Sequence, residues 1–184
     1  MLSRLIALIL IIVISPAMLI IFIISFIELG TNIFFFQERV GKNNKLFKLY
    51  KLRTMRLDTP DKIPTRDFKN PGLYITFFGK YLRKYSIDEI PQLFNVLNGD
   101  MVFIGPRPSL ENEKELNDLR KKNNIHILKP GITGWAQING RDEISVEKKV
   151  ELELFYLNKK SLLVDLKILI FTVYTVLKTR GVSH

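Results

Sequence analysis

Cysteine is absent from this chain of 184 residues, and histidine occurs only twice, as His126 and His184. The absence of cysteine excludes disulfide bonds and thiolate chemistry. The two histidines lie too far apart in the sequence to indicate a zinc site. Any bound metal is therefore expected to be a hard cation that carboxylate and phosphate oxygens hold.

Several familiar catalytic motifs are missing as well. The sequence has no Walker-type phosphate loop, no G-x-G-x-x-G segment that opens a helix and no G-x-S-x-G nucleophile elbow. A nucleophile of the Ser-His or Cys-His type is disfavoured, because the chain has no cysteine and only two histidines. Repeats and low-complexity linkers are not found either, which leaves room for one domain after the N-terminal segment.

Acidic residues are few relative to basic ones. The chain has 18 Asp and Glu residues against 28 Lys and Arg residues, and its net charge is +10. This excess favours polyanionic partners, which can be nucleic acid, phosphate-bearing substrates or anionic lipid. The long apolar segment beside a basic stretch favours lipid and phosphates over nucleic acid.

Residues 5–27 form an apolar run that is long enough to cross a bilayer. A straight helix of this length reaches roughly 34 Å, and a hydrocarbon core is about 30 Å thick. Ser15 and Pro16 interrupt the middle of the run. Pro16 has no amide hydrogen and its ring meets the carbonyl of Ile12, so a kink or break is expected here, and the Ser15 hydroxyl can bond to a freed carbonyl.

The charges around this run bear on its topology, because Lys and Arg prefer the cytoplasmic side of a membrane. Arg4 precedes the run, and a basic stretch follows it over residues 39–56. The favoured interpretation is a re-entrant segment that turns at Ser15 and Pro16 and leaves by the face it entered. A single kinked spanning helix is the alternative, since membrane helices tolerate proline. A cleaved signal peptide fits poorly, because no small-x-small cleavage site is present.

The remaining sequence predicts helices and one hairpin. Residues 33–38 and 45–52 flank a turn at 41–44 and predict a β-hairpin. Residues 58–72 read as a loop and a plausible substrate lid. Helical spacing predicts helices over 76–97, where Pro91 places the start of the second helix near 86–88, and over 110–124. Residues 161–179 predict another helix, which is too polar to span a membrane and suits the membrane interface.

Asp88 and Glu89 stand at the expected start of a helix, after the cations Lys80, Arg83 and Lys84. The helix dipole and these cations are expected to keep both acids ionised. Such a carboxylate can attack phosphorus or hold a divalent cation. Helix capping alone would also explain two acids at this position.

Two further segments could bind phosphate. In the segment GPRP at 105–108, two prolines stiffen the backbone and fix the direction of Arg107, although an ordinary surface arginine would fit the same pattern. The stretch 130–141 mixes glycines with Gln137 and Arg141 and suits close approach of backbone to a ligand. Turn formation explains these glycines equally well.

Together these segments resemble the small monotopic phosphoglycosyl transferases, the bacterial sugar transferases that start glycan assembly on a polyprenyl phosphate. The resemblance runs from the apolar segment to about residue 181. Its most specific matches, in order and spacing, are residues 47–55, 82–101, 105–108 and 130–141. Members of that family have a re-entrant membrane helix broken at a Ser-Pro pair, which corresponds to Ser15 and Pro16 here.

The resemblance implies a two-step transfer. Asp88 would attack the β-phosphate of a UDP-sugar, release UMP and form a phosphosugar-aspartate. Polyprenyl phosphate would then take the phosphosugar, with Mg²⁺ at Asp88 offsetting charge and Glu89 assisting as base or by orientation. The residues that would bind substrate phosphates and sugar are Lys51, Arg53, Arg83, Arg107, Gln137 and Arg141.

These inferences together describe a mainly α protein with a small β-hairpin. Residues 1–30 form the re-entrant membrane helix, and residues 31–184 form one cytosolic catalytic domain with interfacial amphipathic helices. The expected location is the cytoplasmic face of the bacterial inner membrane. The partners are a UDP-sugar, polyprenyl phosphate and an anionic membrane, with no nucleic acid; the sugar, the polyprenol length and the oligomeric state, a homodimer included, are left open.

The chain also departs from the family pattern. The basic entry to the membrane helix is reduced to Arg4, Val146 stands where many relatives have Trp, and Asp142 stands where Asn is frequent. Two rival interpretations keep some of these features: a basic membrane anchor that binds without turnover, and an inactive scaffold for other glycan enzymes. The anchor explains the charge and the apolar run but not two carboxylates among cations.

Overall fold

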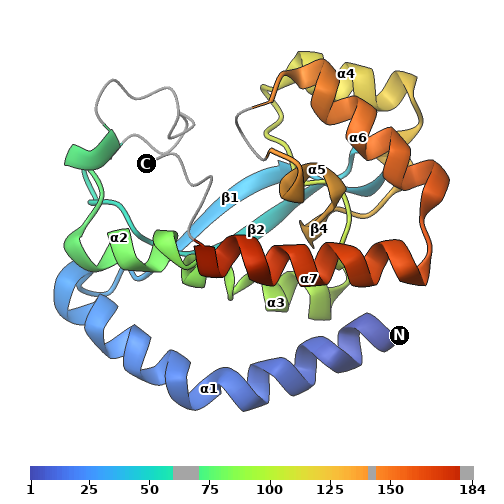
Figure 1. The fold of residues 1–184 in the computed structure, drawn as a ribbon. Coiled ribbons are helices and arrows are strands. Elements are labelled where there is room, and N and C mark those ends of the chain that lie inside the picture. Colours follow the sequence, from blue (N-terminus) through green and yellow to red (C-terminus); the bar gives the residue numbers. More distant parts are fainter. Residues whose placement is uncertain (60–70, 141–143, 179–184) are drawn as a thin grey trace.

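The computed structural model describes residues 1–59, 71–140 and 144–178. Its first element is the long helix α1 (Leu2–Leu29), which continues through Ser15 and Pro16 and bends about midway along its length (Figure 1). Ser15 Oγ donates a hydrogen bond of 2.8 Å to the carbonyl of Ile12, the group that loses its usual partner at Pro16. The expected kink is confirmed, and the helix bends here without ending.

A β-hairpin follows α1, as the sequence predicts. Strands β1 (Phe34–Val40) and β2 (Leu46–Leu52) pair antiparallel, with Phe34 opposite Leu52. The turn between them is a short 3₁₀ segment, η1 (Lys42–Asn44), in which Asn43 and Asn44 adopt positive φ. Asparagine tolerates this left-handed conformation better than most residues, so the turn chemistry agrees with the fold.

A second, parallel pair of short strands was not predicted. Strands β3 (Val102–Ile104) and β4 (Gly131–Thr133) lie side by side with a helix between them in the chain. Side chains on Gly105 and Gly131 would collide with the facing backbone, so both positions require glycine. Strands of three residues are too short to show an alternation of apolar and polar side chains, and the two strands of this pair are distant in the sequence.

The other elements are helical. In chain order they are η3 (Pro71–Leu73), α2 (Phe77–Lys84), η4 (Ile87–Glu89), α3 (Gln92–Asn98), α4 (Lys114–Lys122), η5 (Ile125–Ile127), α5 (Trp135–Ile138), α6 (Val146–Lys159) and α7 (Leu162–Lys178). Helix α7 agrees with the prediction, and Ser161 caps it through a bond from the Val164 amide. Helix α4 is shorter than the predicted 110–124, and α6 was not predicted.

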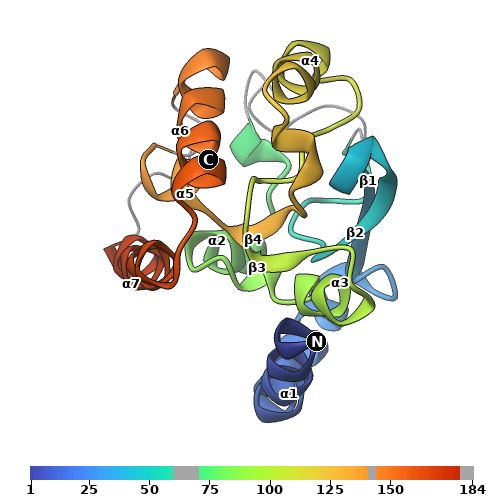
Figure 2. The ribbon, with the colours of Figure 1, turned by 90° about the vertical axis from the view of Figure 1, so that its right-hand side faces the viewer.

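The elements form layers that Figures 1 and 2 show from two sides. Helix α1 lies below α2 and α3, the hairpin and the β3–β4 pair lie above these helices, and α4 and α6 cover the upper side. One buried cluster joins Ala7 of α1 to Leu49, Val96 and Met101, and another joins Met18 of α1 to Leu52 and Leu82. Helix α1 thus contributes side chains to the core of the fold.

Most of α1 nevertheless remains exposed. It is the one helix among the described residues that is long and apolar enough to cross a membrane, and only 11% of its most apolar window is buried. Helix α7 also exposes large apolar side chains, among them Leu162, Leu163, Leu166, Ile170 and Phe171. Exposed apolar area on this scale marks a surface that another apolar phase covers.

Asn95 joins the hairpin to α3. Its side chain is fully buried; Oδ1 accepts the Tyr50 amide at 3.0 Å and Nδ2 donates to the Lys48 carbonyl at 2.7 Å. Two backbone groups of β2 are satisfied by this one side chain. The contact fixes β2 against the helix that follows Asp88 and Glu89.

Replacing Asn95 by Ala should lower the free energy of unfolding by about 3 kcal/mol, because both backbone groups of β2 lose their partner in a buried place. Thermal and denaturant unfolding of the detergent-solubilised protein measures the change. The matched control is Asn123→Ala, which removes a half-buried bond of 2.8 Å to Leu119 and should change stability by less than about 1 kcal/mol. Equal effects of the two substitutions would contradict this role of Asn95.

Candidate active site

Asp88 and Glu89 lie in η4, the single 3₁₀ turn between α2 and α3. Ser86 precedes the turn with a positive φ of 55°, which redirects the chain after α2. The sequence predicted that the two acids form the first turn of the following helix. This is wrong, because helix α3 begins only at Gln92 and both acids come before it. Turn η4 packs against β2, and this contact places the acids beside Lys51.

Glu89 is held between two cations. Lys51 Nζ lies 2.7 Å from Glu89 Oε1, and Arg107 Nη2 lies 3.2 Å from the same oxygen. Lys51 Nζ also lies 3.9 Å from Asp88 Oδ2. The structure therefore brings together Lys51, Asp88, Glu89 and Arg107, four of the residues that the sequence had proposed for chemistry and binding.

The two acids have opposite pKa shifts. Burial raises the pKa of Asp88, and the neighbouring Glu89 charge adds to this, while Lys51 opposes it. Burial also acts to raise the pKa of Glu89, but the charges and hydrogen bonds of Lys51 and Arg107 outweigh it and hold that pKa well below its usual range. The prediction that a helix dipole and nearby cations keep both acids ionised did not include this burial, which acts on Asp88 more than its cations do because Lys51 bonds mainly to Glu89.

Arg83 is a further cation near Asp88. It comes from α2, and its Nε donates to Thr54 Oγ1 at 2.7 Å. The Arg83 charge lowers the pKa of Asp88, while burial lowers the pKa of Arg83 itself. Thr54 is buried and directs this guanidinium, a role that sequence reasoning missed.

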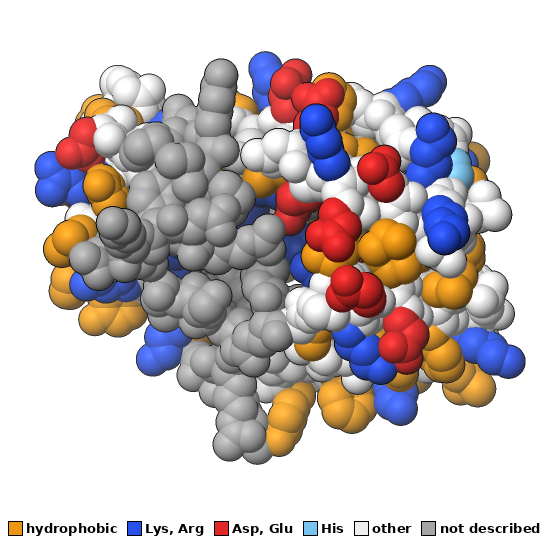
Figure 3. All heavy atoms as spheres, turned by 90° about the horizontal axis from the view of Figure 1, so that it is seen from above, with side chains coloured by type: hydrophobic (Ala, Val, Ile, Leu, Met, Phe, Trp, Pro, Cys, Tyr) orange, Lys and Arg blue, Asp and Glu red, His pale blue; other side chains and the backbone are white. Residues whose placement is uncertain are grey.

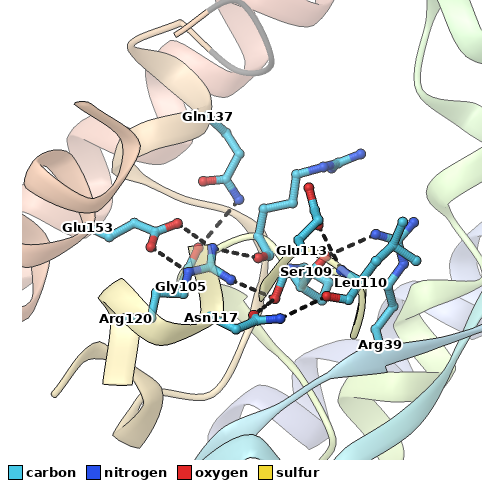
Figure 4. A network of polar contacts seen from close by, with 11 residues as sticks. Arg39, Gly105, Ser109, Leu110, Glu113, Asn117, Arg120, Gln137 and Glu153 are labelled. Carbon is cyan, nitrogen blue, oxygen red and sulfur yellow. Dashed lines mark hydrogen bonds and ion pairs between the residues drawn. The ribbon is translucent and has the colours of Figure 1, made fainter. Parts of the chain in front are cut away.

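Other predicted binding residues have different surroundings. The guanidinium carbon of Arg53 lies 5.6 Å from the centre of the Phe35 ring, a cation–π contact. Gln137 is buried, and its Nε2 donates to the Gly105 carbonyl at 3.4 Å (Figure 4). Arg141 and the departure at Asp142 lie outside the described residues, as does most of the proposed lid at 58–72.

The donor set suits a hard cation. The described residues contain no cluster of three His, Cys, Asp or Glu side chains. Mg²⁺ does not need such a cluster, because it commonly binds one or two carboxylates together with substrate phosphates and water. Lys51 and Arg107 occupy Glu89, so the Asp88 carboxylate is the group in this site that fits Mg²⁺.

The site combines a buried carboxylate with three cations from separate parts of the chain. Such an arrangement suits attack on a phosphorus centre, because the cations reduce the repulsion between a carboxylate and a phosphate group. The Glu89 carboxylate holds two of these cations, Lys51 and Arg107, in place in the absence of substrate.

Comparison with known proteins identifies the family of this chain. The model of the family described as bacterial sugar transferase matches residues 1–179. The chain is 45% identical to an uncharacterized sugar transferase, EpsL, of Bacillus subtilis over 86% of this chain and 76% of that protein. It is 36% identical to the exopolysaccharide production protein ExoY of Sinorhizobium fredii, over 96% of this chain and 84% of that protein.

A larger relative has a more specific name. The UDP-glucose:undecaprenyl-phosphate glucose-1-phosphate transferase of Escherichia coli is 40% identical over 77% of this chain, which spans 32% of that protein. The match to the family model covers nearly the whole chain, and the two small relatives match over most of their length. This chain therefore belongs to the bacterial sugar transferase family and is an enzyme of the phosphoglycosyl transferase class.

Proposed function

We propose that this protein transfers a sugar-1-phosphate from a UDP-sugar to undecaprenyl phosphate, giving a polyprenyl-diphosphate-sugar and UMP as the first membrane step of glycan assembly. The observation that carries the proposal is the buried Asp88 carboxylate among Lys51, Arg83 and Arg107. The names of the Escherichia coli relative and of an Aeromonas hydrophila relative that transfers N-acetylgalactosamine phosphate agree with it.

In the first step an Asp88 oxygen attacks the β-phosphorus of the UDP-sugar. A bond forms between that oxygen and phosphorus, the bond from phosphorus to the bridging oxygen breaks, and UMP leaves with that oxygen. In the second step an oxygen of the polyprenyl phosphate attacks the same phosphorus and releases the Asp88 carboxylate. Both steps bring anions together, so Lys51, Arg83 and Arg107 lower the barrier by offsetting their charge.

Glu89 acts in this scheme by orientation. Two cations bond to one of its oxygens, and its pKa is held below the ordinary value of 4.5, so it is a weak acceptor of protons. Its carboxylate keeps Lys51 and Arg107 directed at the position where a diphosphate would lie. This favours the orienting role over the role of general base.

The Asp88 carboxylate would hold Mg²⁺, and the cation would supply neutralisation of negative charge during the transfer. Arg53, Gln137 and Arg141 complete the proposed substrate contacts.

We further propose that α1 enters and leaves the membrane by the cytoplasmic face, with residues 1–30 as the membrane part and 31–184 as the catalytic domain. Both ends of α1 contact the same body: Arg4 Nη2 donates to the Asn98 carbonyl at 2.9 Å, and Glu28 Oε1 accepts the Phe78 amide at 3.1 Å. A straight spanning helix of 28 residues would place its ends roughly 42 Å apart across the bilayer. The bend and these two contacts support a re-entrant helix.

The kind of side chain exposed on each side supports the same orientation. Charged side chains of both signs cover α4 and α6 on the face that is seen from above (Figure 3), and this face is turned away from α1 (Figure 1). The exposed apolar side chains of α7, together with Phe77 and Tyr81 of α2, suit helices that lie in the membrane interface.

Single cysteines placed at Ser3 and at Lys45 should both be protected from a membrane-impermeant thiol reagent in intact cells. The chain has no cysteine of its own, so each label reports one site. Labelling of both sites after lysis is the control for accessibility. Labelling at position 3 in intact cells would contradict the re-entrant topology. Replacement of both Ser15 and Pro16 by Leu should straighten the helix, and position 3 should then become more accessible to the reagent in intact cells.

Asp88→Asn and Asp88→Glu should each lower UMP release by orders of magnitude, because the first removes the nucleophile and the second moves its oxygen by one methylene. The assay uses a panel of UDP-sugars with polyprenyl phosphate and Mg²⁺. Mass spectrometry of wild-type protein incubated with UDP-sugar alone should find a phosphosugar on the peptide that contains Asp88. An active Asp88→Asn variant, or an adduct on another peptide, would contradict the proposed nucleophile.

The rate of UMP release should fall on the acid side with a midpoint above 3.8, the ordinary pKa of an Asp carboxyl, because burial raises the pKa of Asp88 and its protonated form does not attack. Lys51→Met should move this midpoint to still higher pH, because Lys51 is the strongest of the charges that lower that pKa. The pH profile of kcat/KM measures both effects. The control Lys45→Met removes an exposed cation and should leave the midpoint unchanged; a midpoint that ignores Lys51 would refute the assignment.

A further inference from the structure

The segment from Gly105 to Leu110, called here the Arg107 loop, is held in place by hydrogen bonds to all of its backbone carbonyl groups. Each of the six carbonyls accepts a hydrogen bond from a different residue elsewhere in the chain. In loop order, the donors are Gln137 Nε2 at 3.4 Å, the Gly131 amide at 2.9 Å, Arg120 Nη2 at 2.9 Å, Arg39 Nη1 at 3.3 Å, the Val40 amide at 2.9 Å and Asn117 Nδ2 at 2.9 Å.

The carbonyl of Arg107 itself is bound by Arg120 of α4. Arg120 is buried at 7% exposure, and its Nη1 also donates to Ser109 Oγ at 3.0 Å. One guanidinium therefore holds two residues of the loop on either side of Pro108. Figure 4 shows Arg120 between the loop and α6.

Glu153 of α6 fixes the plane of this guanidinium. Its Oε2 accepts Arg120 Nε at 2.7 Å and its Oε1 accepts Arg120 Nη2 at 2.5 Å, a bidentate pair. Glu153 is 2% exposed. Because both carboxylate oxygens are engaged, the direction of Arg120 Nη2 towards the Arg107 carbonyl is set by α6.

Helix packing alone does not account for this pair. An apolar cluster of Leu116, Ile125 and Val150 already joins α4 to α6. A buried ion pair loses hydration of both charges, and well-packed apolar residues are often at least as stabilising in its place. What the pair provides beyond stability is a fixed donor at the backbone of Arg107.

We propose that Arg120 and Glu153 form a positioning pair for Arg107, which they hold so that its guanidinium reaches Glu89 and the phosphate that is transferred. The chain of contacts runs from Glu153 to Arg120, from Arg120 to the Arg107 carbonyl, and from the Arg107 side chain to Glu89 at 3.2 Å. This inference rests on the proposed function in one respect, the role of Arg107 at the phosphate.

A double-mutant cycle tests the pair. The wild type, Arg107→Ala, Glu153→Gln and the double variant are compared in kcat/KM for UMP release. Glu153→Gln should lower kcat/KM by about tenfold to a hundredfold in the wild type, since small displacements of a binding group have effects of this size. In the Arg107→Ala background the same substitution should change it by less than about twofold, because Arg107 is no longer present to be displaced. Arg120→Lys, which keeps the charge but not the bidentate geometry, should behave like Glu153→Gln.

A merely structural role would give a different result. If Glu153→Gln acted by destabilising the fold, its loss would be the same with and without Arg107, and this outcome would overturn the proposal. Ser145→Ala is the matched control in α6: it removes the side-chain bond of Ser145 to the Lys148 amide at 3.3 Å, and it should leave kcat/KM within about twofold of the wild type. Thermal unfolding reports the stability of every variant.

Failure of the proposed function can be told apart from failure of the pair. If wild-type protein releases no UMP from any UDP-sugar, the proposed function fails, and the pair is then tested by crystal structures of the variants. In Glu153→Gln the guanidinium of Arg120 should turn away from the Arg107 carbonyl, and the Arg107 side chain should no longer lie within hydrogen-bond distance of Glu89 Oε1, which is 3.2 Å in the wild type. Ser145→Ala should keep both contacts; an unmoved Arg107 side chain in Glu153→Gln would overturn the proposal.

Discussion

Charge repulsion is the constraint on which the rest of this structure depends. In the proposed reaction, an anionic carboxylate must approach a diphosphate, and a second phosphate must follow, in a place where burial already raises the pKa of Asp88. Cations reduce the repulsion between the anions and lower the pKa of Asp88, but cations placed together without an anion would repel one another. Glu89 resolves this conflict, because one of its oxygens holds Lys51 and Arg107 together beside Asp88.

The cations come from parts of the chain that are distant in sequence, so the fold exists largely to bring them together. Lys51 is on β2, Arg83 is on α2 and Arg107 is on a loop after β3. Asn95 fixes β2 to α3 and Thr54 directs Arg83, so each cation is positioned by a second, buried side chain. Such support gives the site its geometry before any substrate binds.

Local patterns could be predicted from the sequence, and distant pairings could not. The hairpin, the kink at Pro16 and α7 follow from turn residues, a missing amide and helical spacing, which are all local. The β3–β4 pair and the roles of Asn95 and Glu153 depend on segments tens of residues apart, and each strand of the pair has only three residues. Lys51, Asp88, Glu89 and Arg107 were named from the sequence and lie together in the structure, but the raised pKa of Asp88 was not foreseen, because burial cannot be read from neighbouring residues.

The bend in α1 concerns a helix that is long and apolar enough to cross a membrane and that also packs against the rest of the fold. Ala7 lies on one side of the bend and Met18 on the other, and each is buried against a different cluster that also contains residues of β2. Ser15 keeps the Ile12 carbonyl bonded where Pro16 cannot, so the helix can bend without leaving a bare polar group in an apolar phase. Ser15 and Pro16 therefore allow this long apolar helix to pack at two places against the core beside Lys51.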